Sequence, residues 1–172
     1  MNFDYKAIIR YILILTFLVF IQKTFIYYIT LSDFNIAPDL VVIAIAFIGA
    51  KEGKIHGMLF GFFAGLMFDM LSGSFFGLSA LSYTLAGFLA GFFKTENEKF
   101  VYNWFFMITV FVSSFLANVI YFGFYFQGTP LNFTVVLLSY VMTSSTYTTL
   151  ISFIYTIIPR KKGIDRSFIS ES

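Results

Sequence analysis

Cysteine is absent from this sequence, which excludes disulfide bonds and thiolate metal sites. Histidine occurs once, as His56, so a metal centre is not expected. Charged residues are scarce: they make up 12% of the chain, against about a quarter in a typical soluble domain. Hydrophobic residues make up 59%. A water-soluble fold of this length could not bury so much apolar surface, so we predict an integral membrane protein.

Residues in a catalytic arrangement are also missing. No nucleophile stands beside a plausible base, and no glycine-rich loop suits a phosphate. Asp39 and Asp69 could face one another as an acid pair, which is a weak argument for chemistry. We therefore expect no enzyme activity, no catalytic residue and no cofactor. The net charge of +2 does not indicate a nucleic-acid partner, because the basic residues lie between apolar segments rather than in one patch.

Polar breaks divide the chain into six apolar segments. They lie at about residues 7–31, 38–50, 55–71, 75–93, 100–126 and 131–158. Five have or approach the length of about 20 residues that crosses ~30 Å of hydrocarbon, whereas the second is short enough to be re-entrant. We predict that residues 1–158 form a single domain, an all-α bundle of six transmembrane helices. Residues 159–172 are expected to be a basic, disordered cytoplasmic tail.

The first apolar segment begins like a signal peptide, with basic residues before an apolar run. It continues as Gln22-Lys23-Thr24-Phe25, without a cleavage site of small residues. We therefore expect it to be retained as the first span.

Lysine and arginine are sorted to one side of this arrangement. Ten of the eleven basic residues lie before or at the start of the first segment, follow the sixth, or lie in the second and fourth connections. The other connections, residues 32–37, 72–74 and 127–132, contain neither Lys nor Arg. Because these residues collect in cytoplasmic loops, we predict a multi-pass protein of the cell membrane with both termini in the cytoplasm. The same parity favours a second segment that crosses fully.

Small residues recur at every fourth position in the middle of the chain. Gly57, Gly61 and Gly65 form a slowly winding groove along the third segment, because steps of four drift by only ~40° around a helix axis. The fourth segment carries a second ladder, Gly87 and Gly91, beside two alanines. Such residues let two helix backbones approach closely. We expect the groove to pack the third helix against the fourth, to receive another protein, or both.

Three ionisable residues lie in or at the ends of the apolar segments. Asp69 comes ~21 Å up the third helix and Lys23 ~24 Å along the first. Pro38 suits a first helical turn, and Asp39 meets the positive end of the dipole of the second helix. All three reach the outer third of the membrane. We predict a polar cluster in which Lys23 pairs with Asp39, Asp69 or both; the alternative is that each side chain extends separately to outer water.

Other polar side chains inside the apolar segments are expected to support packing. Asn118 lies in the middle of the fifth segment and should bond a neighbouring helix. The sixth segment is rich in Ser and Thr, whose hydroxyls can bond back to their own helix. We expect that arrangement, and not a ligand-lined cavity.

A specific motif runs from about Pro38 to Gly91. It reads Pro38-Asp39-Leu40, then Gly57-x3-Gly61-Phe62-x2-Gly65-Leu66-x2-Asp69-x2-Ser72-Gly73, then Gly77-Leu78-x-Ala80-Leu81. In the order of its glycines, aspartate and Ser-Gly turn, the chain resembles MreD, the family of small membrane proteins of the bacterial rod-shape system. The flanking helices add length and topology but little specific information. Ser79 departs from the larger polar or aromatic residue often expected at that position.

The resemblance implies a membrane scaffold or regulator and not an enzyme. Proteins of this family belong to the machinery that builds the side wall of rod-shaped bacteria. They associate with MreC, a single-span protein with a large periplasmic domain, and through it with the MreB filament, the RodA polymerase and a class B penicillin-binding protein. We therefore expect this chain to bind MreC, to support side-wall peptidoglycan synthesis and to maintain cell shape. Asp39, Asp69 and the glycine groove would support the fold or the partner surface.

A rival function follows from the same resemblance, because the family fold is similar to the substrate-binding subunits of energy-coupling-factor transporters. The chain could capture a vitamin or metal for such a transporter. That function requires ligand-sized polar side chains in the outer loops, which here span only six, three and six residues. An enzyme acting on lipid-linked substrates is a third alternative and lacks candidate residues.

Overall fold

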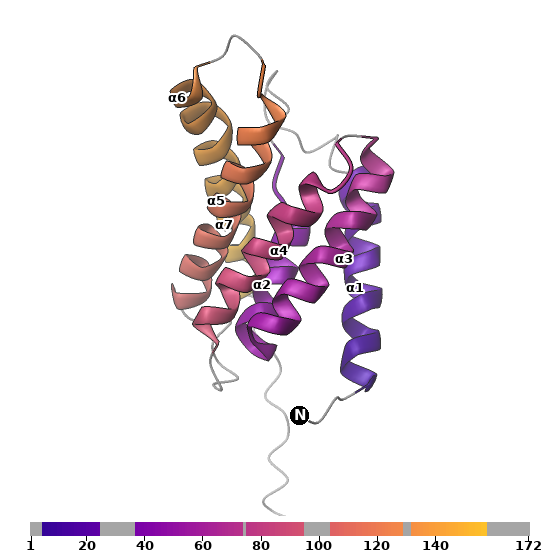
Figure 1. Cartoon of the computed structure of the whole chain (residues 1–172). Coiled ribbons are helices and arrows are strands. Elements are labelled where there is room, and N and C mark those ends of the chain that lie inside the picture. The colour runs from indigo at the N-terminus through magenta and orange to yellow at the C-terminus, as the bar shows by residue number, and fades with distance from the viewer. Residues whose placement is uncertain (1–4, 25–36, 74, 95–103, 129–131, 158–172) are drawn as a thin grey trace, which may run out of the picture.

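The protein is a bundle of helices, seen along its length in Figure 1. The computed structural model describes residues 5–24, 37–73, 75–94, 104–128 and 132–157, which contain helices and turns and no strand. In chain order the helices are α1 (Tyr5–Thr24), α2 (Leu40–Glu52), α3 (Lys54–Ser72), α4 (Leu78–Ala90), the 3₁₀ turn η2 (Gly91–Phe93), α5 (Trp104–Tyr125), α6 (Phe133–Val135), the π-helical stretch η4 (Val136–Met142) and α7 (Thr143–Ile157).

The predicted all-helical fold is confirmed for the described residues. Among them, four stretches are long and apolar enough to cross a bilayer: α1, α3, α5, and Phe133–Ile154, which joins α6, η4 and most of α7. α2 has only 13 residues, and α4 with its 3₁₀ extension is also short. Six crossings and cytoplasmic termini therefore stay predictions. The predicted tail, residues 159–172, lies outside the described residues.

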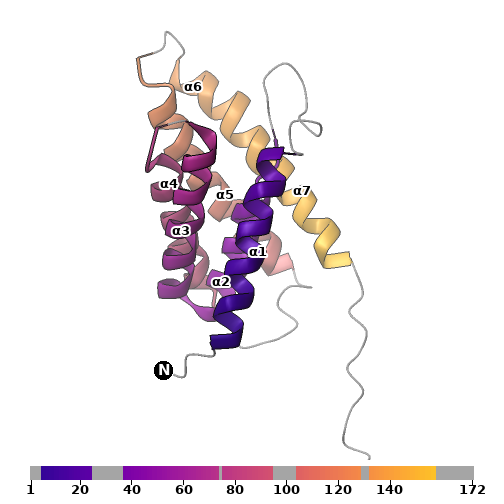
Figure 2. The same ribbon diagram turned by 90° about the vertical axis from the view of Figure 1, so that its right-hand side faces the viewer.

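The short helix α2 is the centre of the bundle. It contacts α1, α3, α4, α5 and α7, and Figure 2 shows it behind α1. Seven of its 13 residues are buried, among them Val41, Ile45 and Ala50. Its length corresponds to ~20 Å of rise. Because other helices cover much of α2 and bond its first backbone N–H groups, a full membrane-spanning length is not required of it.

A single residue, Gly53, connects α2 to α3. Its backbone has φ 104° and ψ 179°, a conformation that L side chains rarely adopt. The chain reverses there, so that Gly49 and Gly57 lie against one another. The turn also brings Lys51 and Lys54 to the same end of the bundle.

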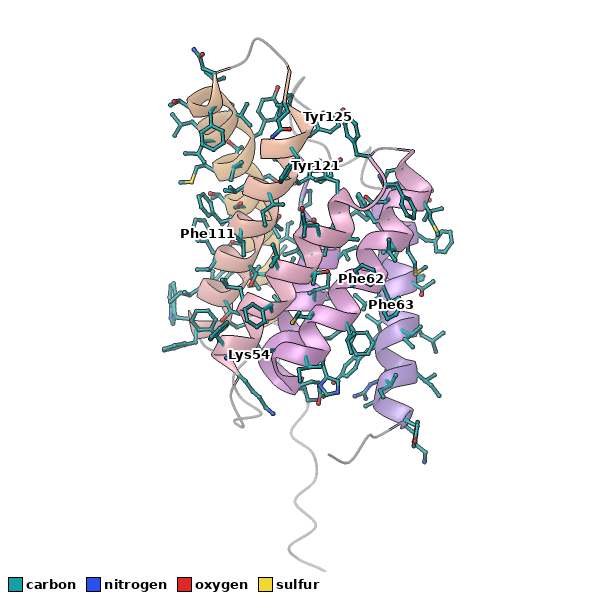
Figure 3. The ribbon with its side chains drawn as sticks, in the orientation of Figure 1. Lys54, Phe62, Phe63, Phe111, Tyr121 and Tyr125 are labelled. Atoms are coloured by element: carbon teal, nitrogen blue, oxygen red, sulfur yellow. The ribbon has the colours of Figure 1, made fainter. Side chains whose placement is uncertain are left out.

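Large apolar side chains point away from the bundle and small ones fill it. Phe17, Phe63 and Trp104 are 60–77% exposed, whereas the core includes many Val, Ala, Ser and Gly residues. Figure 3 shows the rim of aromatic side chains around the helices. In water such a surface would cause aggregation, but lipid is the solvent that it suits.

The two ends of the bundle differ in charge. At one end α1 begins, α2 meets α3, and α4 with η2 finishes, which brings together Lys6, Arg10, Lys51, Lys54 and Lys94. The Tyr11 hydroxyl donates to Glu52 Oε1 at 2.7 Å and joins α1 to α2 there. We call this the basic end. At the opposite end, which we call the aspartate end, lie Asp39, Asp69 and the C-terminal part of α5; Figure 3 labels Lys54 near the first and Tyr125 near the second.

Candidate functional site

Asp39 is the most connected polar residue at the aspartate end. It is the N-cap of α2, and its Oδ1 accepts from Val42 N at 3.1 Å. The same oxygen accepts from Gln22 Nε2 of α1 at 3.1 Å, and Oδ2 accepts from the Tyr83 hydroxyl of α4 at 2.7 Å. Pro38 precedes this cap, so it lies just outside the first helical turn where we predicted it. The carboxylate thus joins three helices.

Two further bonds extend this connection to a fourth helix. Asp39 N donates to Thr148 Oγ1 of α7 at 3.0 Å. Val41 N donates to Gln22 Oε1 at 3.1 Å, so the Gln22 side chain both donates and accepts at the start of α2. The first backbone N–H groups of a helix have no partner inside it. Gln22 and Thr148 supply partners here from α1 and α7.

Asp69 caps a helix other than its own. It lies near the end of α3 and is buried, with 2% of its surface exposed. Its Oδ2 accepts from Gly77 N at 2.8 Å, Ser79 N at 3.1 Å and Ala80 N at 3.3 Å, at the start of α4. A carboxylate is favoured there because the N-terminus of a helix carries partial positive charge. Asp69 therefore holds the end of α3 against the start of α4.

Lys23 lies in the same region but contacts an aromatic ring. Its Nζ is 3.9 Å from the centroid of Phe68 on α3, a cation–π contact. Among the described residues we find no direct ion pair of Lys23 with Asp39 or Asp69, whose oxygens accept from the donors given above. The structure gathers the three predicted residues at one end, while the function of this cluster stays a prediction.

The two glycine ladders face each other across α3 and α4. A Cβ at Gly57 would overlap the carbonyl oxygen of Gly87, and one at Gly61 would overlap that of Tyr83. A Cβ at Gly65 would overlap the backbone of Ala80, and one at Gly91 the backbone of Lys54. The groove is therefore filled within the chain by close backbone contact, the first of the two alternatives that the spacing left open.

A cavity of about 390 Å³ lies at the aspartate end beside the bonds of Asp39. Helices α1, α3, α4, α5 and α7, the stretch η4 and the residues just before α2 contribute to its walls. Polar or ionisable side chains line it: Gln22, Lys23, Asp39, Ser79, Asn118 and Ser144. Aromatic side chains complete it: Phe68, Tyr83, Tyr121, Phe122, Tyr125, Phe126 and Tyr140. Figure 3 shows Tyr121 and Tyr125 on the part of α5 that faces this end.

Polar residues of α5 and α7 behave as expected. Asn118 Nδ2 donates to Ser145 Oγ at 3.0 Å and joins α5 to α7, which confirms its predicted bond to a neighbouring helix. The hydroxyls of Thr146, Thr148 and Thr149 each donate to the carbonyl oxygen four residues earlier, as predicted. Ser144 nevertheless also lines the cavity, which we did not expect of the sixth segment.

Gln22, Tyr83 and Thr148 are the site residues that sequence reasoning missed. None belongs to a recognisable motif: Gln22 precedes Lys23, Tyr83 lies in the middle of the fourth segment, and Thr148 is one of several hydroxyl residues in the sixth. The one available signal was the rarity of Gln in a membrane helix, since a buried amide there needs a partner.

Comparison with known proteins gives one match. The model of the family described as rod shape-determining protein MreD matches residues 5–158, nearly the whole chain. No curated protein matches the chain. No solved structure matches it either.

Proposed function

The chain belongs to the MreD family of rod shape-determining proteins, and from this premise we propose that it is a non-enzymatic membrane scaffold of the bacterial cell-wall elongation complex. In this proposal it maintains rod shape by supporting side-wall peptidoglycan synthesis. The family match over residues 5–158 carries the proposal. An interior locked by glycine contacts and helix caps supports it, because a scaffold must hold its outer faces in fixed positions.

The direct partner in this proposal is MreC, through its single transmembrane helix. MreB, RodA and a class B penicillin-binding protein belong to the wider complex in the cytoplasmic membrane. Since α3 and α4 occupy each other's glycine ladders, the partner helix meets some other face. The exposed aromatic side chains on α1, α3, α5 and α7 offer such faces.

We further propose that all six helical segments of residues 1–158 cross the membrane, with the basic end in the cytoplasm. The grouping of the basic residues at one end supports this orientation, since Lys and Arg favour the cytoplasmic side. The aspartate end and its cavity then face outward.

Photo-crosslinking tests the partner assignment. A photoreactive phenylalanine analogue replaces one exposed phenylalanine at a time, on α1, α3, α5 and α7: Phe17, Phe63, Phe105 and Phe153. In irradiated cells, the positions on one face should give a crosslink to MreC and the positions on the other faces should not, because a single helix covers only one face. An abundant unrelated single-span protein serves as the specificity control. If no position captured MreC while every variant kept cells rod-shaped, direct binding would be refuted.

A second function is favoured by one observation, the cavity of about 390 Å³. A substrate-binding subunit of an energy-coupling-factor transporter needs a ligand-sized pocket. The two functions differ in what co-purifies from membranes under mild detergent. The scaffold yields MreC, whereas the transporter subunit yields a pair of ATPases and a transmembrane coupling protein.

A further inference from the structure

The cavity at the aspartate end is bordered by polar groups for which the described residues supply no hydrogen-bond partner. Its volume of about 390 Å³ falls in the usual range for small-molecule sites. It lies where α1, α3 and α5 finish and α2 and α4 begin. We therefore asked which of its groups are already satisfied and which are available to a ligand.

The carboxylate in its wall is occupied. Both oxygens of Asp39 accept hydrogen bonds, from Gln22, Val42 and Tyr83. The amide of Asn118 donates to Ser145 of the neighbouring helix. These groups hold the helices together, and a ligand that needed a carboxylate partner would have to break existing bonds.

Lys23 provides free donors. An ammonium group carries three N–H donors, and the face of Phe68, 3.9 Å away, satisfies the charge only in part. Within the described residues we find no carboxylate in contact with it. A half-buried charge in a membrane protein is costly and commonly marks an ion or substrate site.

Ser79 provides a second free group. The residue is among those that border the cavity, and it is 1% exposed. Its Oγ has no hydrogen-bond partner among the described residues, although Ser82 and Thr84 of the same helix bond back to carbonyl oxygens. A buried hydroxyl without a partner is unfavourable, so a bound group that accepts its hydrogen bond would stabilise the folded protein.

The opposite wall is aromatic. The ring of Tyr140 on η4 lies 4.9 Å from that of Phe126 and 5.6 Å from that of Phe122. The rings of Tyr121 and Tyr125 stack at 5.7 Å. This wall suits a flat or apolar portion of a ligand, next to the end that reaches Lys23.

We propose that this cavity binds a molecule that carries a phosphate or carboxylate group, with Lys23 and Ser79 as donors to the anion and the aromatic wall of α5 and η4 against its apolar portion. The molecule is either a lipid with an anionic headgroup or a soluble anion. This inference does not depend on MreC as the partner and goes beyond the scaffold function.

Thermal unfolding of the purified full-length protein in a zwitterionic detergent tests the proposal, because a ligand of the folded state raises its Tm. Four probes are compared: short-chain phosphatidylglycerol, short-chain phosphatidylcholine, glycerol phosphate and inorganic phosphate. We expect phosphatidylglycerol, glycerol phosphate or both to raise Tm, and phosphatidylcholine not to. A shift with the lipid alone identifies a headgroup attached to a bilayer lipid, and a shift with glycerol phosphate or inorganic phosphate identifies a soluble anion.

Variants identify the site. In Lys23→Gln the Kd should rise about tenfold to a hundredfold, as expected for the loss of a charged hydrogen bond. Lys23→Arg keeps the charge and should keep binding, and Ser79→Ala should weaken it less than Lys23→Gln. Lys94→Gln removes an exposed lysine at the basic end and should leave the Kd unchanged. Equal binding by Lys23→Gln and wild type, no shift with any anion, or a shift with phosphatidylcholine alone would each refute the proposal.

Discussion

At the scale of single residues, the polar side chains at the aspartate end act mainly on helix termini. Asp39 caps its own helix, and Asp69 caps α4 from α3. In a bilayer the N–H groups at a helix start cannot turn to water when they are buried. A carboxylate that accepts several of them therefore stabilises the fold more than one at a protein surface would.

Replacing Asp69 by alanine tests this role. Asp69→Ala should lower the free energy of unfolding by about 2 kcal/mol or more, because three backbone N–H groups lose their acceptor. Asp69→Asn keeps one carbonyl oxygen and should lose about half as much. The measurement is equilibrium unfolding of the purified protein in mixed micelles with increasing dodecyl sulfate. The adjacent Met70→Ala changes an exposed residue and serves as the control. Equal losses in Asp69→Ala and Met70→Ala would contradict the cap.

Some of these residue roles could be predicted and others could not. Asp39 after Pro38 and Asp69 after the glycine ladder stood out because a charge in an apolar segment requires a reason. Their partners could not be inferred, since the sequence does not tell which side of α1 or α4 faces α2. Tyr83 looked like one of 11 tyrosines. The contact of Lys23 with Phe68 was likewise hidden among 26 phenylalanines.

At the scale of helices, the packing of the glycine ladders could be predicted from the sequence, whereas the irregular helix of the sixth segment could not. The ladder predicted close packing because the spacing alone fixes a face. The π-helical stretch Val136–Met142 was not predicted. Its apolar sequence resembles that of any membrane helix. A π-helix differs from an α-helix in pairing backbone groups five residues apart instead of four, and no residue type marks that change. It places Tyr140 in the cavity wall, so this unpredictable element contributes to the candidate site.

Two helical glycines, one packed against another helix and one in open space, allow the packing role to be tested. Gly61→Ala would bring a Cβ into the carbonyl of Tyr83, which is backbone and cannot rotate away, so α3 and α4 must separate. We expect a loss of about 3 kcal/mol in the free energy of unfolding. Gly123→Ala on α5 meets nothing within 4 Å and should be neutral or stabilise by up to about 1 kcal/mol. The same micelle titration measures both, and a Gly61→Ala protein as stable as Gly123→Ala would show that the ladder is not a packing surface.

At the scale of the whole molecule, the proposals for scaffold and ligand site depend on how the bundle lies in the membrane. The described basic residues other than Lys23 gather at one end, and the bond between Tyr11 and Glu52 places the end of α2 beside the start of α1. A re-entrant α2 would leave Lys51 on the side where α1 finishes. The position of Glu52 therefore favours an α2 that returns across the bundle.

Cysteine labelling settles the orientation, and the absence of native cysteine makes each variant a single-site probe. Lys51→Cys and Lys94→Cys place a thiol on exposed residues of the basic end, and Gln127→Cys on an exposed residue just after α5 at the aspartate end. A membrane-impermeant maleimide applied to intact cells should label Gln127→Cys and leave the other two unlabelled until the cells are permeabilised, because the Lys- and Arg-rich end stays in the cytoplasm. An α2 that turned back without crossing would reverse every later crossing, so both lysine positions would be labelled in intact cells and Gln127→Cys would not. Labelling of both lysine positions would mean that the basic end faces outward. The anion cavity would then face the cytoplasm, where soluble anions and not outer-leaflet headgroups would be able to reach it.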